Sequence, residues 1–271
     1  MNIEMSRFCI NRKIAPNLSI ERFFSLVQRL GLNKVELRND MPGGKVTDNL
    51  SHAQVAELAD KYGLEILTIN AVYPFNQLND EVLKKTQGLL RDAKEVGAKA
   101  LVLCPLNDGT PVADGVTLNA IKELSVLFAD YGVQGYVEPL GFPISSLRSA
   151  VHTQQLIREA KSPFKLMLDT FHHHLYENAE NEFSQHIDIS AIGLVHLSGV
   201  EDKRPTATLT DEERIMLSDK DVMENYRQVK RLEEMGYRGN YSFEPFSSTL
   251  AAWNEAEIEK QINHSIGLLL K

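Results

Sequence analysis

Short apolar segments alternate with amphipathic stretches along the whole chain. The apolar segments are rich in Val, Ile, Leu and Phe and lack strict alternation with polar residues, which is typical of buried parallel strands. We expect strands at eight places: 7–11, 34–37, 65–70, 100–104, 135–138, 165–169, 193–196 and 240–244.

The amphipathic stretches between these segments predict helices. Ser19 and Ser51 stand where an N-cap is expected, and Gly31 and Gly63 follow the last turn of the same two stretches. The main expected helices are 19–31, 51–63, 80–96, 118–131, 146–160, 221–235 and 254–270, with a weaker one at 180–187.

Eight strands alternating with eight helices predict an α/β fold, a (β/α)₈ TIM barrel. Strand starts fall mostly about thirty residues apart, near the size of one βα unit. The length of 271 residues suits a single barrel domain over 1–271. A long polar stretch between His196 and the helix at 221–235 indicates a functional loop or lid.

The composition narrows the class of partner. The formal net charge is −8, which argues against a nucleic-acid or anionic-membrane partner. No long apolar run predicts a transmembrane helix, and the first residues lack the apolar core of a signal peptide. Cys9 and Cys104 lie in apolar segments, as expected for thiols in a reducing compartment, so we expect a cytoplasmic protein.

Four strands in the second half of the chain each end on a residue that can bind a metal ion. These residues are Glu138, Asp169, His196 and Glu244. In a β/α barrel, strand ends meet at the C-terminal rim, where active sites are built. Three carboxylates and one imidazole suit one divalent ion, such as Mn²⁺, Mg²⁺, Co²⁺ or Zn²⁺. Proline follows both glutamates, which favours extended backbone at the strand end.

Other polar residues are expected near the same rim. His172 follows Asp169 by three residues and is placed to reach a bound substrate, whereas His173 and His174 are interpreted as solvated loop residues. Arg214 lies in the long loop after the seventh strand and could pair with a substrate oxygen. Three further residues stand near strand ends and could hydrogen-bond hydroxyl groups: Asn11, Arg38 and Asn70.

Eight segments carry a resemblance to a known superfamily: CINRKI, KVELR, TINAVYPFN, VEPLGFP, LDTFHHH, VHLSGVED, LTDEERI and YSFEPF. With them, the chain resembles the xylose-isomerase-like TIM-barrel superfamily, and within it the 2-keto-myo-inositol (inosose) isomerases of inositol catabolism. The resemblance implies that the four residues bind a metal such as manganese, that His172 touches substrate and that Arg214 is the loop arginine. Superfamily members are often oligomers, so the resemblance is compatible with a homo-oligomer.

The sequence differs from these relatives at two places in the loop after the seventh strand. Gly199 stands where relatives often have aspartate, and residues 217–220 replace a P-G-x-G turn. Both changes bear on the geometry of the loop that carries Arg214.

The implied reaction is a proton transfer through an enediolate in a keto-inositol or related ketose, with Glu138 and Glu244 as the acid–base couple. Which glutamate is the base stays open at this point. A sugar 3-epimerase would use the same chemistry. An apurinic-site endonuclease would need further histidines after the third and fourth strands, where the chain has Asn70 and Cys104. A non-catalytic sugar-binding barrel has no evident need for two facing glutamates.

Overall fold

The computed structural model describes residues 1–271, and its strands close into one parallel barrel in the order β1 to β8. Each strand pairs in parallel with the next, and β8 pairs with β1. The predicted TIM barrel is therefore confirmed. The strands are β1 (Phe8–Asn11), β2 (Lys34–Arg38), β3 (Glu65–Val72), β4 (Ala100–Leu103), β5 (Gln134–Val137), β6 (Lys165–Asp169), β7 (Ile192–Leu197) and β8 (Tyr241–Phe243).

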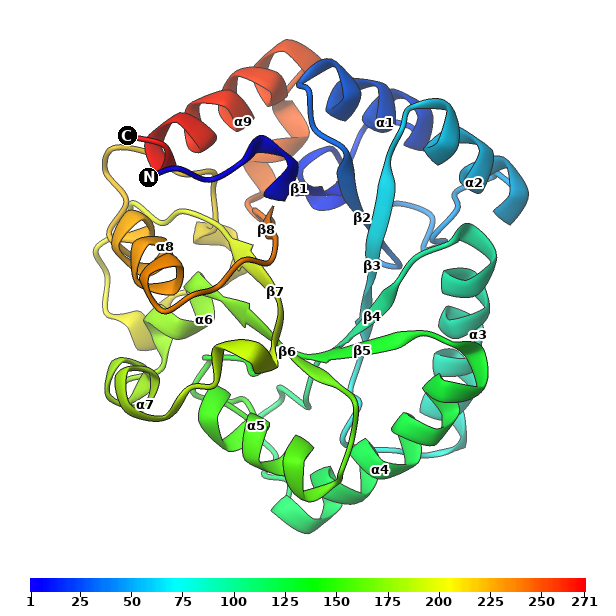
Figure 1. Cartoon of the computed structure of the whole chain (residues 1–271), viewed down its shortest axis with the longest axis vertical. Helices are drawn as coiled ribbons and strands as arrows, with labels where there is room; N and C mark the ends of the chain where they lie inside the picture. The colour runs from blue at the N-terminus through cyan, green and yellow to red at the C-terminus, as the bar shows by residue number, and fades with distance from the viewer.

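The α-helices form a ring around the strands (Figure 1). Two of the predicted caps are present: the Ser19 side chain accepts a hydrogen bond from Arg22 N, and Ser51 forms a capping box with Gln54. The helices are α1 (Ile20–Arg29), α2 (His52–Lys61), α3 (Asp80–Val96), α4 (Asp114–Tyr131), α5 (Ala150–Glu159), α6 (Thr170–Leu175), α7 (Ala179–His186), α8 (Asn225–Glu234) and α9 (Glu255–Leu269).

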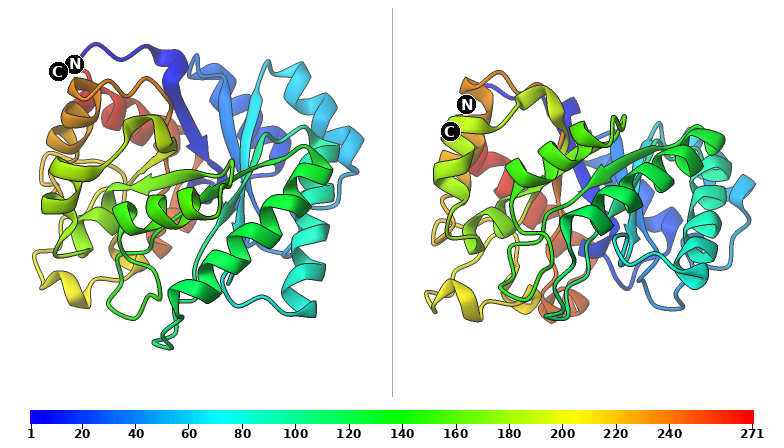
Figure 2. Two further views of the ribbon diagram at one scale, coloured as in Figure 1. Left: turned by 60° about the horizontal axis from the view of Figure 1, so that its bottom comes forward. Right: turned by 90° about the horizontal axis from the view of Figure 1, so that it is seen from below.

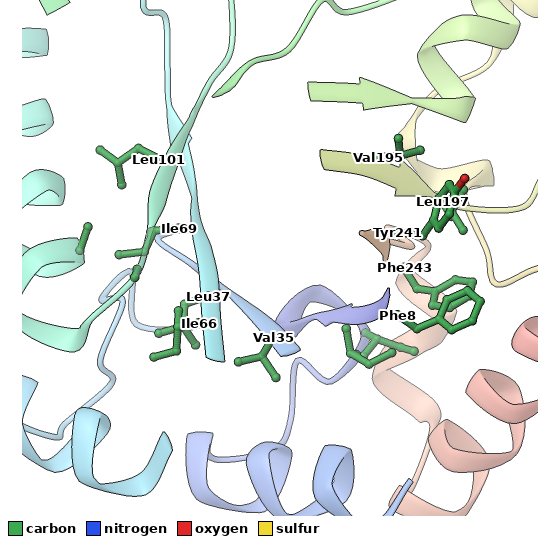
Figure 3. Close-up of a cluster of buried hydrophobic side chains, with 14 of the residues drawn as sticks. Phe8, Val35, Leu37, Ile66, Ile69, Leu101, Val195, Leu197, Tyr241 and Phe243 are labelled. Atoms are coloured by element: carbon green, nitrogen blue, oxygen red, sulfur yellow. The ribbon is translucent and has the colours of Figure 1, made fainter. Parts of the chain in front are cut away.

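Alternate side chains of each strand point outward and pack against the helices. These outward residues belong to the main apolar core, which comprises 55 buried residues and therefore lies between the barrel and the ring of helices. Figure 3 shows several of them, from Phe8 on β1 to Phe243 on β8. The aromatic rings of these two residues stack with their centroids 6.0 Å apart and join the first strand to the last.

The side chains that point into the barrel form a second set with two levels. The lower level is apolar and comprises Cys9, Leu67, Val102, Met167 and Leu194. Because the strand period is two, the next inward residues come two positions later: Asp169 follows Met167, and His196 follows Leu194. This upper level is polar and lies at the C-terminal rim.

Several element boundaries differ from the sequence prediction. Residues 146–149 do not begin α5, because Ser146 N donates to Leu106 O at 2.8 Å and ties this segment to a neighbouring loop. The strands β5 and β8 end one residue before Glu138 and Glu244. Helix α6 was not expected, and it places His173 and His174 on a helix, half-buried rather than in a solvated loop.

The two ends of the chain lie side by side (Figure 2), where the Met1 amino group donates to Lys271 O at 2.6 Å. Both cysteines are free thiols. None of the helices combines the length and the apolar character needed to cross a membrane.

Candidate metal centre and active site

The four predicted ligand residues converge on one point inside the rim. Glu138, Asp169, His196 and Glu244 are all buried, and each offers one ligand atom within 4.8 Å of the others. The His196 Nδ1 atom lies 3.2 Å from Glu244 Oε1, 3.7 Å from Glu138 Oε1 and 4.0 Å from Asp169 Oδ2. Three carboxylates and one ring nitrogen therefore surround a common space.

The backbone explains why the two glutamates point inward although both strands have just ended. Glu138 N donates to Leu103 O at 2.9 Å, and Glu244 N donates to Leu197 O at 2.8 Å. Each bond extends the parallel hydrogen-bond ladder with the preceding strand by one residue. The alternation of inward and outward side chains therefore continues to both glutamates, which point into the barrel. The prolines at 139 and 245 follow directly and donate no further ladder bond.

His196 shows how well the cluster suits a cation. Its Nε2 atom lies 2.9 Å from each carboxylate oxygen of Glu36, whereas its Nδ1 atom is buried and has no hydrogen-bond partner. An unpartnered buried nitrogen facing three carboxylates is costly unless a positive charge lies between them. One nitrogen and three oxygens are a donor set that divalent transition metals accept, so the residues present fit such an ion.

Burial and neighbouring charges set the protonation of the four residues. Burial raises the pKa of Glu138 to about 7, although His196 opposes this effect. Burial likewise raises the pKa of Asp169. For Glu244 the effect of burial is outweighed by His196 and two arginines, which hold the pKa of that carboxyl well below its usual range. Burial also opposes a charge on His196, but the carboxylates around it raise the pKa of its imidazole well above the ordinary value.

The two glutamates differ in their partners as well. Glu244 accepts hydrogen bonds from Arg38 Nη1 at 2.7 Å and from Arg214 Nη2 at 3.3 Å. Glu138 has no arginine partner, and its Oε2 atom instead faces the thiol of Cys104 at 3.6 Å. Glu244 is therefore held as an anion, whereas Glu138 is free to gain or lose a proton.

Arg214 enters this site from the loop after β7, as the sequence predicted for its position. Its guanidinium donates to Asp169 Oδ2 at 2.6 Å and lies between the rings of Phe171 and Phe246, 4.7 and 4.5 Å from their centroids. The loop returns through paired backbone bonds between Gly199 and Ile215.

The departure at Gly199 follows from the close approach of that loop. A Cβ atom at this position would lie only 2.5 Å from Met216 O, so the returning chain requires glycine. The loop is packed as well: Val200 and Leu209 belong to a small apolar cluster with Phe171 on α6. It therefore holds Arg214 in a fixed position.

His172 lies on α6 beside Glu138. Gly141 N donates to His172 Nδ1 at 2.9 Å, so the ring proton is on Nε2, which lies 4.0 Å from Glu138 Oε1. Burial, with a further contribution from Arg214, lowers the pKa of His172 to about 3. His172 is therefore a neutral donor that faces the same space as Glu138.

The other three predicted rim residues, Asn11, Arg38 and Asn70, are also buried near this space. Asn11 and Asn70 direct their amide nitrogens at Glu36, at 2.9 and 3.1 Å. Arg38 pairs with Asp40 as well as with Glu244. The polar groups of these residues already bind carboxylates of the protein. Their contact with a substrate stays a prediction.

Sequence reasoning missed Glu36, the carboxylate that holds His196. It lies in the middle of β2 rather than at a strand end, and it is fully buried. A charged residue between Val35 and Leu37, two residues before Arg38, could have indicated an inward-facing polar group.

The fold and the cluster define a TIM-barrel protein with a candidate site for one metal ion at the C-terminal rim. A family model described as "Xylose isomerase-like TIM barrel" matches residues 24–270, and the chain belongs to this family. A comparison with curated protein sequences returned no match.

Solved structures extend this comparison. A xylose isomerase domain-containing protein of Salmonella typhimurium LT2 is 74% identical, with 100% of each chain covered and a TM-score of 0.99. The IOLI protein, solved with a bound zinc atom, is 21% identical over 97% of each chain, with a TM-score of 0.86. A D-allulose 3-epimerase from Methylomonas sp. is 17% identical over 99% of this chain and 100% of its own, with a TM-score of 0.70. The last two likenesses concern the fold.

Proposed function

We propose that the protein is a metal-dependent isomerase that moves a carbonyl group between neighbouring carbons of an uncharged polyol, with keto-inositols (inososes) as the preferred substrates. The observation that carries this proposal is the unequal pair of glutamates at one centre. Glu244 is paired with two arginines, whereas Glu138 has none. Glu244 can thus remain ionised, whereas Glu138, which is also a candidate ligand, can exchange a proton.

The charges around the centre favour a substrate without phosphate or carboxylate groups. Arg38 donates to both oxygens of Asp40, at 2.7 and 2.9 Å, and Arg214 is paired with Asp169. Lys13 lies 3.9 Å from Asp40. An anionic substrate group would require a cation that is not already paired. Hydroxyl and ketone oxygens need no such charge.

A divalent cation held by Glu138, Asp169, His196 and Glu244 would polarise the ketone and stabilise negative charge on the substrate oxygens. Glu138 takes the proton from the carbon that bears the neighbouring hydroxyl, since it is the carboxylate without an arginine partner. It then returns a proton to the former carbonyl carbon on the same face of the substrate. The hydroxyl proton passes to the former ketone oxygen, so hydroxyl and ketone exchange places with no net gain or loss of protons.

The neighbouring residues keep this transfer directed. Arg38 and Arg214 hold Glu244 deprotonated, so that it does not compete for the proton. His172 presents its Nε2–H toward the space beside Glu138 and donates to a substrate oxygen as charge develops there.

A ketose 3-epimerase is the second candidate, because the similar folds include an L-ribulose 3-epimerase and a D-allulose 3-epimerase. An epimerase removes a proton on one face and adds one on the other, which requires two groups that exchange protons. Here Glu138 is the one carboxylate of the cluster without an arginine partner, and this difference favours the isomerase.

The test is incubation in D₂O of the metal-loaded protein with inosose and with a panel of ketohexoses, followed by proton NMR after removal of protein and metal. We expect a positional ketone isomer of inosose that carries deuterium at the exchanged carbon. Glu138→Gln should abolish both product and deuterium, whereas Glu177→Gln, at an exposed glutamate paired with Arg148, should retain them. Epimerised ketose without positional isomer would establish the second candidate. Recovery of every substrate without isomerisation or deuterium would refute the proposed function.

A further inference from the structure

Glu36 collects more hydrogen bonds than any role in strand packing requires. Its side chain is fully buried inside the barrel, on the inward face of β2. Side chains from four other strands, β7, β8, β1 and β3, donate to this carboxylate. The donors are Thr68 Oγ1 at 2.7 Å, Asn70 Nδ2 at 3.1 Å, Asn11 Nδ2 at 2.9 Å, Ser242 Oγ at 2.5 Å and His196 Nε2 at 2.9 Å.

The surrounding bonds fix the direction of several of these donors. The Thr68 hydroxyl accepts from Asn70 Nδ2 at 3.0 Å, so its own proton is directed at Glu36. The Asn11 side-chain oxygen accepts from Lys13 N at 2.9 Å, which leaves the amide nitrogen facing Glu36. A carboxylate surrounded by donors acts only as an acceptor, which is the behaviour of the ionised form.

This arrangement decides which nitrogen of His196 carries a proton. Nε2 lies 2.9 Å from both oxygens of Glu36, so a lone pair on Nε2 would face two negatively charged oxygens. When Nδ1 binds an ion, the one remaining ring proton therefore lies on Nε2. The Nδ1 atom on the other side of the ring is buried, has no hydrogen-bond partner and faces the oxygens of Glu138, Asp169 and Glu244.

We propose that Glu36 is a positioning residue that holds His196 with its Nδ1 lone pair at the metal centre, and that it thereby makes the site selective for nitrogen-binding transition ions over Mg²⁺. A carboxylate behind a histidine ligand orients the ring, sets its tautomer and strengthens the nitrogen as a donor. Mn²⁺, Co²⁺ and Zn²⁺ gain from a stronger imidazole ligand, whereas Mg²⁺ prefers oxygen ligands and water.

Because this role requires the metal centre of the proposed function, the experiment measures metal binding and not turnover. Co²⁺, Zn²⁺ and Mg²⁺ affinities are determined by calorimetry and chelator competition for the wild type and for Glu36→Gln, which keeps the shape of the side chain but removes its charge. Glu177→Gln is the matched control, since it makes the same change at an exposed glutamate paired with Arg148. Circular dichroism checks folding.

We expect Glu36→Gln to bind Co²⁺ and Zn²⁺ about 10–100-fold more weakly than the wild type, with a smaller loss for Mg²⁺. Glu177→Gln should stay close to the wild type. Unchanged Co²⁺ and Zn²⁺ affinity in folded Glu36→Gln would overturn the role of Glu36 and leave the proposed function intact. A wild type that binds no divalent ion would overturn both.

A second measurement on the wild type keeps the role testable if Glu36→Gln fails to fold. Nitrogen NMR of the zinc-loaded protein with ¹⁵N-labelled histidine, assigned with His196→Gln, reports which ring nitrogen bears the proton. A proton on Nε2 and zinc on Nδ1 is the expected result. A proton on Nδ1 would contradict the inference.

Discussion

Replacement of Arg214 by methionine tests whether the buried charges of the centre are balanced as described. Arg214 is 1% exposed, and its Nη2 atom lies 2.6 Å from Asp169 Oδ2 and 3.3 Å from Glu244 Oε1. Methionine keeps an apolar stem between Phe171 and Phe246 but removes the charge. Asp169 would then be a buried carboxylate without its cationic partner.

The expected cost follows from this loss of a partner. Removing one member of a buried ion pair costs about 3–5 kcal/mol, because the remaining charge stays desolvated. Arg204 in the same loop provides a matched control. It lies 2.7 Å from Asp202, but its side chain is 44% exposed, so Arg204→Met should cost no more than about 1 kcal/mol.

The assay is guanidinium unfolding at neutral pH with a chelator present, followed by circular dichroism. The midpoint and slope give the free energy of unfolding of each variant relative to the wild type. We expect Arg214→Met to lose several times more stability than Arg204→Met. Equal losses for the two variants would refute the view that Arg214 neutralises a buried carboxylate at the centre.

Two further predictions concern residues around the centre and on the surface. Gly141→Ala would place a Cβ atom 2.1 Å from His172 O and displace the amide that fixes the His172 ring, so kcat/KM should fall about 10²-fold while metal affinity measured by calorimetry is kept. Unchanged kcat/KM would contradict this. His173 and Arg231 lower the pKa of Glu180 to about 2, so Glu180 stabilises the fold above its ordinary pKa and loses this effect as pH falls toward 2. Glu180 is half exposed, so Glu180→Gln should cost about 1 kcal/mol at pH 7, with the difference from the wild type vanishing in acid unfolding curves.

The barrel and the convergence of the four candidate ligand residues could be predicted from the sequence for a common physical reason. A parallel barrel buries its strands on both sides, so each strand is a short apolar run, and a polar residue where a run ends lies at the rim. Glu138 and Glu244 fit this rule although each lies one residue beyond its strand, because the ladder continues through their backbone amides.

Features that depend on contacts between distant segments escaped prediction. The sequence predicts only that Glu36 is part of a strand. Its contact with His196 depends on the folded barrel, in which β7 places that ring against the Glu36 carboxylate. Helix α6 is six residues long and rich in histidine, so no hydrophobic period identifies it. The function of Gly199 likewise depends on Met216, which returns to it from a distant part of the loop.

We expect one divalent ion to bind where the four buried residues converge. Anomalous diffraction from crystals of the Co²⁺-loaded protein, recorded on both sides of the cobalt edge, tests it most directly. One strong peak is expected about 2.0–2.2 Å from His196 Nδ1 and from oxygens of Glu138, Asp169 and Glu244. A peak at another place, or none in crystals of protein that carries cobalt in solution, would contradict it.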